Sequence, residues 1–131
     1  MPTVYICHAY LGRFERCMRM MQRKVGSLGL GTFLPLGEED ESKIKSVNDE
    51  GLSNSDGLLA CTRHGLDGLL TLGQSYEVTT SIITGKPTVL WCDPGSYLLN
   101  HYLPKSIDCL HVTSNLNTAL ELLKSELMKK L

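Results

Sequence analysis

Apolar and polar residues follow two spacings along this chain, one typical of strands and the other of helices. Short runs of β-branched, aromatic and aliphatic residues predict strands. These runs occupy residues 3–7, 32–36, 58–61, 88–92 and, more weakly, 107–112. Between them, apolar residues recur every three or four positions, which predicts amphipathic helices. The helices are expected at residues 13–27, from Ser42 to about residue 52, from Gly73 to Gly85 and from Thr113 or Ser114 onward, with a short amphipathic piece at 97–103.

Glycine and proline residues mark the ends of several of these elements. Gly26, Gly29 and Gly31 are expected to stop the first helix, and Gly85 followed by Pro87 to stop the third. Pro35 has no backbone N–H to give to a strand ladder, so the second strand is expected at an edge of the sheet.

Strands and helices alternate five times, and the sequence holds neither an internal repeat nor a low-complexity linker. This order predicts a single α/β domain over residues 1–131, with a five-stranded parallel sheet and helices on both faces in three layers, of the flavodoxin-like or Rossmann-like kind. In such sheets a ligand binds beyond the carboxyl ends of the strands, where the strand order changes direction. We therefore expect a site in the loops after the first, third and fourth strands.

Composition narrows the classes of partner. The formal net charge of −1 gives no electrostatic reason to expect binding to nucleic acid or a membrane surface, so a small molecule and a second copy of the chain are the expected partners. No apolar stretch reaches the ~20 residues of a membrane span, and the N-terminus does not resemble a signal peptide. Five widely spaced cysteines without a CxxC pair favour free thiols in a reducing, cytoplasmic compartment, and no metal site is expected.

The segment 71–78, Thr-Leu-Gly-Gln-Ser-Tyr-Glu-Val, leads into the third helix and carries most of the candidate chemistry. Free N–H groups at a helix N-terminus favour an anion such as phosphate. Glu77 could serve only as a favourable charge near the start of the helix, or it could be a functional carboxylate. A carboxylate beside a bound sugar can attack the anomeric carbon without a metal or a cofactor. His8 closes the first strand and could contact a base or a phosphate, or simply be hydrogen-bonded there.

Several segments resemble the nucleoside 2-deoxyribosyltransferase superfamily in order and spacing. They are residues 4–7, Asn48 eight residues before Asp56, residues 71–78 and residues 85–87. Within the superfamily the chain is most similar to the 2'-deoxynucleoside 5'-phosphate N-hydrolases, whose motif is Ser-Leu-Gly-x-Gly-Tyr-Glu-Leu. The resemblance covers residues 3–92 and is most specific over residues 72–78.

The resemblance implies a role for several of these residues. Glu77 would be the nucleophile that takes the deoxyribosyl group, and Tyr5 would orient its carboxylate. Thr71 would help to hold the 5'-phosphate, which the backbone at Gly73 would approach closely. Asn100 would enter the active site of a neighbouring subunit, so the resemblance implies a homodimer as well.

The chain departs from the family pattern at three places. Asn48 stands where the family has an aspartate that assists the leaving base, and an amide can hydrogen-bond a base but cannot act as an acid. Asp49 follows it, about 100° further around the helix. The phosphate loop after the first strand lacks its usual serine and arginine, with Gly12 and Arg13 displaced by about two residues. Ser75 replaces a glycine and narrows the space beside the sugar.

Two functions are compatible with these residues and with the resemblance. The first is an N-glycosidase that cleaves the N-glycosidic bond of a nucleoside or deoxynucleoside 5'-monophosphate, or a transferase that moves the deoxyribosyl group to another base. The alternative is a nucleotide-binding or sensing module of the same fold that has lost acid catalysis. A response-regulator-like domain is disfavoured, because its acidic cluster at the first strand and the aspartate ending the third are missing. The expected catalytic residues are Glu77, Tyr5 and Asn48, and the expected substrate contacts are His8, Gly12, Arg13, Thr71, Gly73, Ser75 and Asn100.

Overall fold

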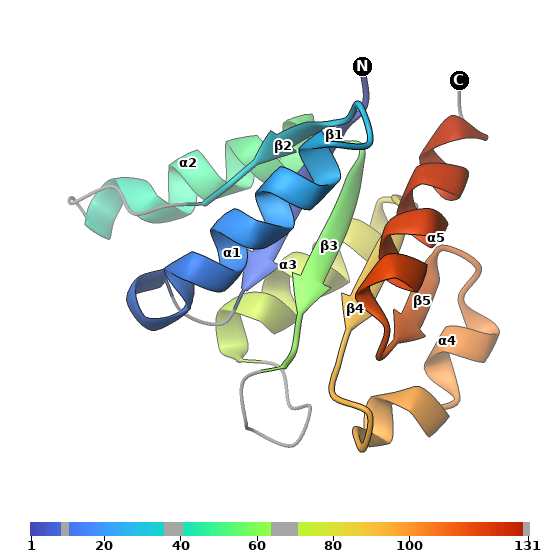
Figure 1. The fold of residues 1–131 in the computed structure, drawn as a ribbon. Coiled ribbons are helices and arrows are strands. Elements are labelled where there is room, and N and C mark those ends of the chain that lie inside the picture. The colour runs from blue at the N-terminus through green and yellow to red at the C-terminus, as the bar shows by residue number, and fades with distance from the viewer. Residues whose placement is uncertain (9–10, 36–40, 64–70, 130–131) are drawn as a thin grey trace.

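The computed structural model describes residues 1–8, 11–35, 41–63 and 71–129 (Figure 1). Its strands are β1 (Thr3–His8), β2 (Gly31–Phe33), β3 (Gly57–Cys61), β4 (Thr88–Trp91) and β5 (Leu110–Thr113). Its helices are α1 (Leu11–Gly26), α2 (Glu41–Asn54), α3 (Leu72–Ile83), α4 (Leu103–Ser106) and α5 (Leu116–Met128), with a short 3-10 helix, η1, at Tyr97–Asn100. No helix among these described residues is long and apolar enough to cross a membrane.

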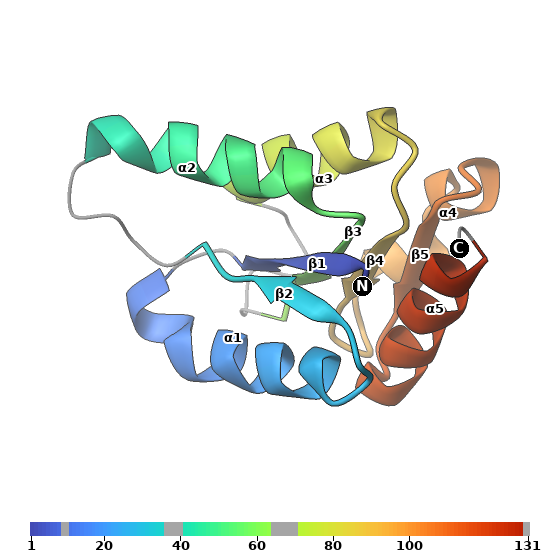
Figure 2. The ribbon, with the colours of Figure 1, turned by 90° about the horizontal axis from the view of Figure 1, so that it is seen from above.

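The five strands form one parallel sheet in the order β2-β1-β3-β4-β5. Helices α1 and α5 cover one face of this sheet, and α2 and α3 cover the other (Figure 2). The predicted three-layer α/β fold with a five-stranded parallel sheet is confirmed. The strand order changes direction at β1, because β2 lies on one side of it and β3 on the other, and ligands bind at this point in folds of this order.

Strand β1 is buried on both faces, and successive side chains alternate between them. Val4 and Ile6 join the core beneath α1 and α5, whereas Tyr5 and Cys7 join the core beneath α2 and α3. Strand β3 pairs with β1 and divides its side chains in the same way. The sheet therefore separates the interior into two compartments.

Two boundaries near the N-terminus differ from the expected ones. Strand β2 ends at Phe33, so Pro35 lies beyond the strand, although β2 is at the edge of the sheet as predicted. Helix α1 begins at Leu11, so Gly12 lies in its first turn and not in a loop, and Arg13 is helical as predicted. A glycine is tolerated there because the first turn of a helix makes few intrahelical hydrogen bonds.

Two boundaries near the C-terminus differ as well. Pro104 does not stop a helix but lies in the first turn of α4, where its missing N–H would have no intrahelical acceptor. Helix α5 begins later than predicted because Asn115 is its N-cap. The Asn115 side chain accepts a hydrogen bond from the Thr118 N–H at 3.0 Å.

The turn after α3 ties this helix to the neighbouring α2. Gly85 has a φ of +72°, a conformation that favours glycine, and it follows the last turn of α3 as predicted. Lys86 then donates hydrogen bonds from Nζ to the carbonyl oxygens of Leu52 at 2.8 Å and Ser53 at 3.1 Å, near the C-terminal end of α2. This contact holds the end of α2 beside the end of α3, on the same face of the sheet.

Gly51 of α2 and Gly73 of α3 make a matched test of this packing. A Cβ atom at Gly51 would lie 2.3 Å from the ring of Phe33, which stacks on Tyr5 with ring centroids 5.3 Å apart. We expect Gly51→Ala to lower the free energy of unfolding by about 1–2 kcal/mol, since the ring must leave its stacked position. A Cβ atom at Gly73 meets no described atom within 4 Å, so Gly73→Ala should be neutral or stabilising by up to ~1 kcal/mol. Urea denaturation measures both, and equal stabilities would contradict the expectation.

Candidate functional site

Glu77 lies in the second turn of α3, close to strand β1. Its atom Oε2 and the hydroxyl oxygen of Tyr5 are both buried, and neither has a hydrogen-bond partner of good geometry among the described residues. The two groups nevertheless lie close enough for each to change the pKa of the other. Buried polar atoms that lack partners are uncommon inside proteins, and perturbed carboxyl groups gather at functional sites.

Burial is the largest influence on the pKa of Glu77 and raises it to about 7. The Tyr5 hydroxyl opposes this rise because it stabilises the carboxylate, whereas the negative charge of Asp49 adds to it. Burial, followed by the nearby Glu77, raises the pKa of the Tyr5 hydroxyl and that of the Cys7 thiol, so both stay protonated at neutral pH. Glu77 is therefore the member of this group whose charge changes near neutral pH.

The N-terminus of α3 is held by two side chains. Thr71 is the N-cap: its hydroxyl oxygen accepts a hydrogen bond from the Gln74 N–H at 3.2 Å, and the Gln74 side chain accepts one from the Thr71 N–H at 3.3 Å. The buried Gln74 amide also donates to the carbonyl oxygen of Cys61 at 2.8 Å. Gln74 thereby ties the start of α3 to the end of β3, and so determines where Glu77 lies nearly one turn later.

The first turn of α3 has donors and space for an anion. The N–H groups of Leu72 and Gly73 have no intrahelical acceptor, and the helix dipole adds positive charge there. Gly73 is exposed, and a Cβ atom at this position would meet no described atom within 4 Å. The Thr71 hydroxyl accepts the capping bond and still has a proton to donate. Ser75 is half-buried in the same turn, two residues before Glu77.

Asp49 of α2, next to the half-buried Asn48, brings a second carboxylate into range of Glu77. It accepts hydrogen bonds from the Tyr76 hydroxyl at 2.9 Å and from Lys45 Nζ at 2.6 Å. Lys45 is the first cause and Tyr76 the second of the lowered pKa of Asp49, so this carboxylate is ionised at neutral pH. Asp49 lies further around the helix than Asn48, but its negative charge raises the pKa of Glu77. Asn48 is a neutral amide and has no such effect.

His8 lies on the opposite face of the sheet from Tyr5, because it is three positions further along β1 and successive side chains alternate between the faces. The thiols of Cys17 and Cys61 lie beside it. The two sulfur atoms are 4.0 Å apart, and the ligating atoms of all three residues lie within 4.8 Å of one another. The predicted site residues Tyr5 and His8 therefore belong to two clusters, one on each face of the sheet.

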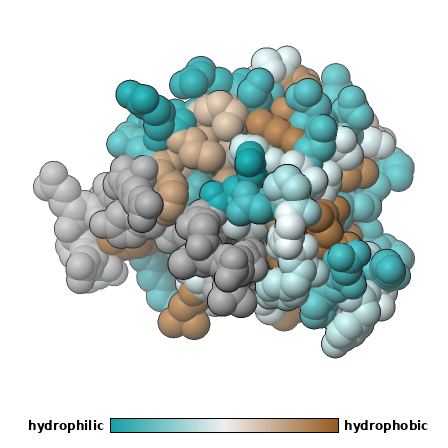
Figure 3. All heavy atoms as spheres, turned by 60° about the horizontal axis from the view of Figure 1, so that its bottom comes forward, coloured by the Kyte–Doolittle hydropathy of each residue, from teal (hydrophilic) through white to brown (hydrophobic). Residues whose placement is uncertain are grey.

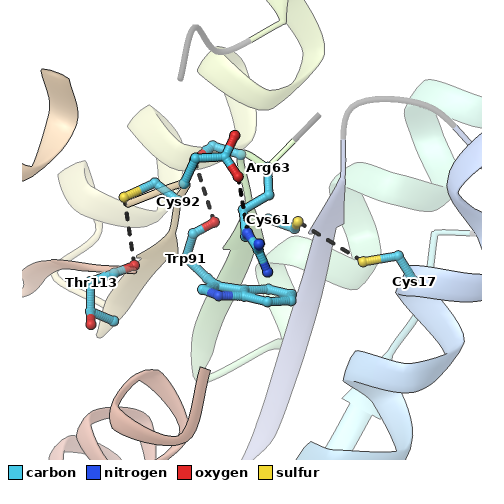
Figure 4. A network of polar contacts seen from close by, with 8 residues as sticks. Cys17, Cys61, Arg63, Trp91, Cys92 and Thr113 are labelled. Carbon is cyan, nitrogen blue, oxygen red and sulfur yellow. Dashed lines mark hydrogen bonds and ion pairs between the residues drawn. The ribbon is translucent and has the colours of Figure 1, made fainter. Parts of the chain in front are cut away.

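Arg63 and the aromatic rings of Phe14 and Trp91 complete the surroundings of this second cluster. The ring of Phe14 stacks on His8, with centroids 4.6 Å apart. The Arg63 guanidinium lies over the Trp91 ring, 4.8 Å from its centroid, and Arg63 Nε donates to Asp93 Oδ1 at 3.1 Å (Figure 4). Trp91 is buried, as expected of an apolar strand residue.

The pKas of the two thiols in the second cluster are displaced in opposite directions. Hydrogen bonding from Cys61, followed by hydrogen bonding from His8, lowers the pKa of Cys17 to about 5. The pairing with Cys17 and then burial raise the pKa of Cys61. The two thiols, whose sulfur atoms are 4.0 Å apart, thus affect each other's ionisation.

Three further predicted residues lie away from Glu77. Gly12 and Arg13 are in α1, which covers the other face of the sheet. Asn100 is exposed at the end of η1, after β4.

Figure 3 views the end of the molecule where the strands finish, with hydrophilic residues near its centre and hydrophobic residues in separate patches.

Some residues of these clusters were not anticipated from the sequence. Gln74 stands three residues after Thr71 at a helix start, which is the spacing of a capping box and was a usable signal. The period of two along each strand also places His8 and Cys61 on one face, once β1 and β3 are paired. Cys17 reaches them only through the packing of α1, which the hydrophobic pattern alone does not specify.

No protein-family model and no curated protein matches this chain. Among solved structures, the chain is similar to the crystal structure of a conserved protein from Enterococcus faecalis V583, with a TM-score of 0.69. The two share 17% sequence identity, and the match covers 100% of this chain and 99% of that one. This similarity shows the fold alone. The resemblance to the deoxyribosyltransferases therefore rests on the sequence motif alone.

Tyr5 and Asp49 should move the pKa of Glu77 in opposite directions. Tyr5→Phe removes a hydroxyl that stabilises the carboxylate, so the pKa of Glu77 should rise above about 7. Asp49→Asn removes a nearby negative charge, so the pKa should fall toward that of an ordinary glutamate. NMR titration of isotope-labelled glutamate side chains measures both shifts, with Glu77→Gln to assign the resonance. Shifts of the same sign in the two variants would show that this description of the site is wrong.

Proposed function

We propose that this protein is an N-glycosidase acting on a nucleoside or deoxynucleoside 5'-monophosphate, with Glu77 as the nucleophile. The observation that carries the proposal is the buried Glu77 carboxylate, which lies beside the Tyr5 hydroxyl where the strand order changes direction. Transfer of the sugar to a second base is the same chemistry with a base in place of water as the acceptor. Hydrolysis and transfer therefore use the same residues.

In the first step a carboxylate oxygen of Glu77 attacks C1' of the sugar, and the C1'–N bond breaks with its electron pair going to the base. The transition state has oxocarbenium character, which the negative charge of Glu77 stabilises. The Tyr5 hydroxyl, which stays protonated, would donate a hydrogen bond to the other carboxylate oxygen. The base takes up a proton from solvent as it leaves. In the second step water attacks C1' and returns a proton to solvent, and the bond between C1' and the Glu77 oxygen breaks to release the carboxylate and the sugar 5-phosphate.

The 5'-phosphate would bind at the N-terminus of α3. The donors available there are the N–H groups of Leu72 and Gly73 and the hydroxyl of Thr71, and the glycine leaves space for close approach. Ser75, in the same turn, would lie beside the sugar. Binding energy from the phosphate, which is remote from the reacting bond, would be used to position C1' against Glu77.

The proposal includes a homodimer in a reducing, cytoplasmic setting. Asn100 is exposed at the end of η1 and would enter the site of the second copy. Tyr97 and Tyr102, on either side of it in the sequence, are exposed too, and a partner chain would cover them. All five cysteines are free thiols, which fits a reducing compartment.

A second candidate is a nucleotide-binding or sensing module, and the surroundings of the leaving base favour it. The departing base needs a proton, which an acid near Glu77 would supply. Asn48 is an amide and has no acidic proton, and Lys45 keeps Asp49 ionised. A chain with this arrangement could retain nucleotide binding after losing cleavage.

Glu77→Ala should abolish base release from every nucleotide. The measurement is incubation of the protein with a mixture of nucleoside and deoxynucleoside 5'-monophosphates, followed by mass spectrometry for free base and sugar phosphate. Glu121→Ala is the control, because Glu121 is an exposed glutamate on α5 and its loss should leave turnover unchanged. Turnover that persists in Glu77→Ala would end the assignment of the nucleophile. Thermal stabilisation by a nucleotide without any base release from the wild type would favour the sensing module.

The rate of base release should rise with pH and level off above about pH 7. Protonated Glu77 cannot attack C1', so kcat/KM should fall about tenfold per pH unit below the pKa. In Tyr5→Phe the midpoint of the profile should move to higher pH, since the pKa of Glu77 rises. Comparing the two enzymes on one substrate separates this effect from ionisation of the substrate phosphate. A midpoint that stays in place would contradict the role given to Tyr5.

A further inference from the structure

His8, Cys17 and Cys61 converge from three elements on the face of the sheet opposite Glu77. His8 ends β1, Cys61 ends the neighbouring β3, and Cys17 comes from the second turn of α1. His8 and Cys61 are buried and Cys17 is half-buried. Figure 4 shows the two sulfur atoms pointing toward each other across the space between the helix and the sheet. The proposed glycosidase reaction uses none of the three as a nucleophile or an acid.

The distances in this cluster are those of a set of metal ligands. The two sulfur atoms are 4.0 Å apart, and one ligating atom from each residue lies within 4.8 Å of the other two. A tetrahedral Zn²⁺ with bonds of ~2.3 Å to sulfur holds two thiolates ~3.8 Å apart. The sulfur atoms thus stand within a few tenths of an ångström of the spacing that a zinc ion requires. A disulfide would require them to approach to ~2.05 Å.

The chemical nature of the three ligands also determines which metal ion would bind. Two thiols and an imidazole are ligands of soft and borderline metals, whereas Ca²⁺ and Mg²⁺ take oxygen ligands. We propose that His8, Cys17 and Cys61 form a binding site for a thiophilic metal ion, with Zn²⁺ as the occupant. Three protein ligands leave the fourth tetrahedral position for water or a small ligand, which is the arrangement of catalytic rather than structural zinc sites.

The surroundings suit a metal with two thiolate ligands. Zn²⁺ with two thiolates and a neutral imidazole has no net charge, so the ion can be buried without an uncompensated charge. Arg63, which follows Cys61 by two residues, is paired with Asp93 and stacked on Trp91. Phe14 stacks on the imidazole of His8 and holds its ring plane. The ligands would therefore be held in place before the ion arrives.

This site departs from what the cysteine spacing suggests. Sequence separations of 9 and 44 residues between the ligands contain no local pair, so no metal was expected. The site also gives His8 a role other than contact with a base or a phosphate. It lies on the other face of the sheet from Glu77, so metal binding and base release can succeed or fail independently.

The test is titration of reduced, metal-free protein with Co²⁺ as a spectroscopic probe, followed by displacement with Zn²⁺. We expect one equivalent of Co²⁺ to bind and to give the thiolate-to-metal charge-transfer absorption of a tetrahedral site. Cys17→Ser and Cys61→Ser should each weaken binding at least tenfold and remove most of this absorption, and His8→Ala should weaken binding. Cys109→Ser is the matched control, because Cys109 is also half-buried but lies outside the cluster. Its spectrum should equal that of the wild type.

A second measurement uses the wild type alone and does not depend on the folding of any variant. Zn²⁺ should slow the alkylation of Cys17 at least tenfold, as mapped by peptide mass spectrometry, and leave the alkylation of Cys109 unchanged. The proposal is overturned if the reduced protein binds no stoichiometric metal, or if Cys17→Ser binds Co²⁺ as the wild type does. It is also overturned if Cys17 and Cys61 form a disulfide on exposure to air and the reduced protein binds neither Co²⁺ nor Zn²⁺.

Discussion

Strand β1 passes alternate side chains to opposite faces of a sheet that is buried on both sides, and this period of two decides which groups can meet. Tyr5 lies with Glu77 beneath α2 and α3, whereas His8 lies with Cys17 and Cys61 beneath α1. A slip of one residue in the pairing of β1 would exchange the two sets and bring polar groups against aliphatic ones. The separation of carboxylate chemistry from thiol chemistry in this molecule is thus a consequence of strand geometry.

The buried carboxyl group of Glu77 lowers the stability of the fold when it is ionised. Because the pKa of Glu77 is raised from 4.5 to about 7 in the fold, folding favours its protonated form. The stabilising effect of that proton is complete below the unfolded value and is lost as pH rises through the folded one. The chain opposes this cost with contacts that hold the neighbouring backbone: Gln74 at the start of α3, and Lys86 where α3 meets the end of α2. A residue retained at such a cost is more consistent with chemistry than with packing.

The fold was predictable because each element carries its own pattern: apolar runs for β1, β3 and β4, and three-to-four spacing for α1 and α3. The expectation that Tyr5 lies near Glu77 came from a resemblance to a family motif and not from the spacing of residues. What sequence could not supply was the set of contacts between elements. Asp49 and Cys17 meet their partners only through the packing of α2 and α1 against the rest of the fold, which no local pattern encodes.

The side chain of Gln74 accepts a bond at the cap of α3 with its oxygen and donates one to the Cys61 carbonyl with its nitrogen. Glutamate could accept the first bond but would set a carboxylate oxygen against a carbonyl oxygen. Asparagine is one methylene shorter and cannot span both partners, and methionine can fill the space without making either bond. A residue at position 74 must therefore offer both an acceptor and a donor at this length. One side chain thus fixes both where α3 begins and how far that beginning lies from the end of β3, so these two features of the fold cannot vary separately.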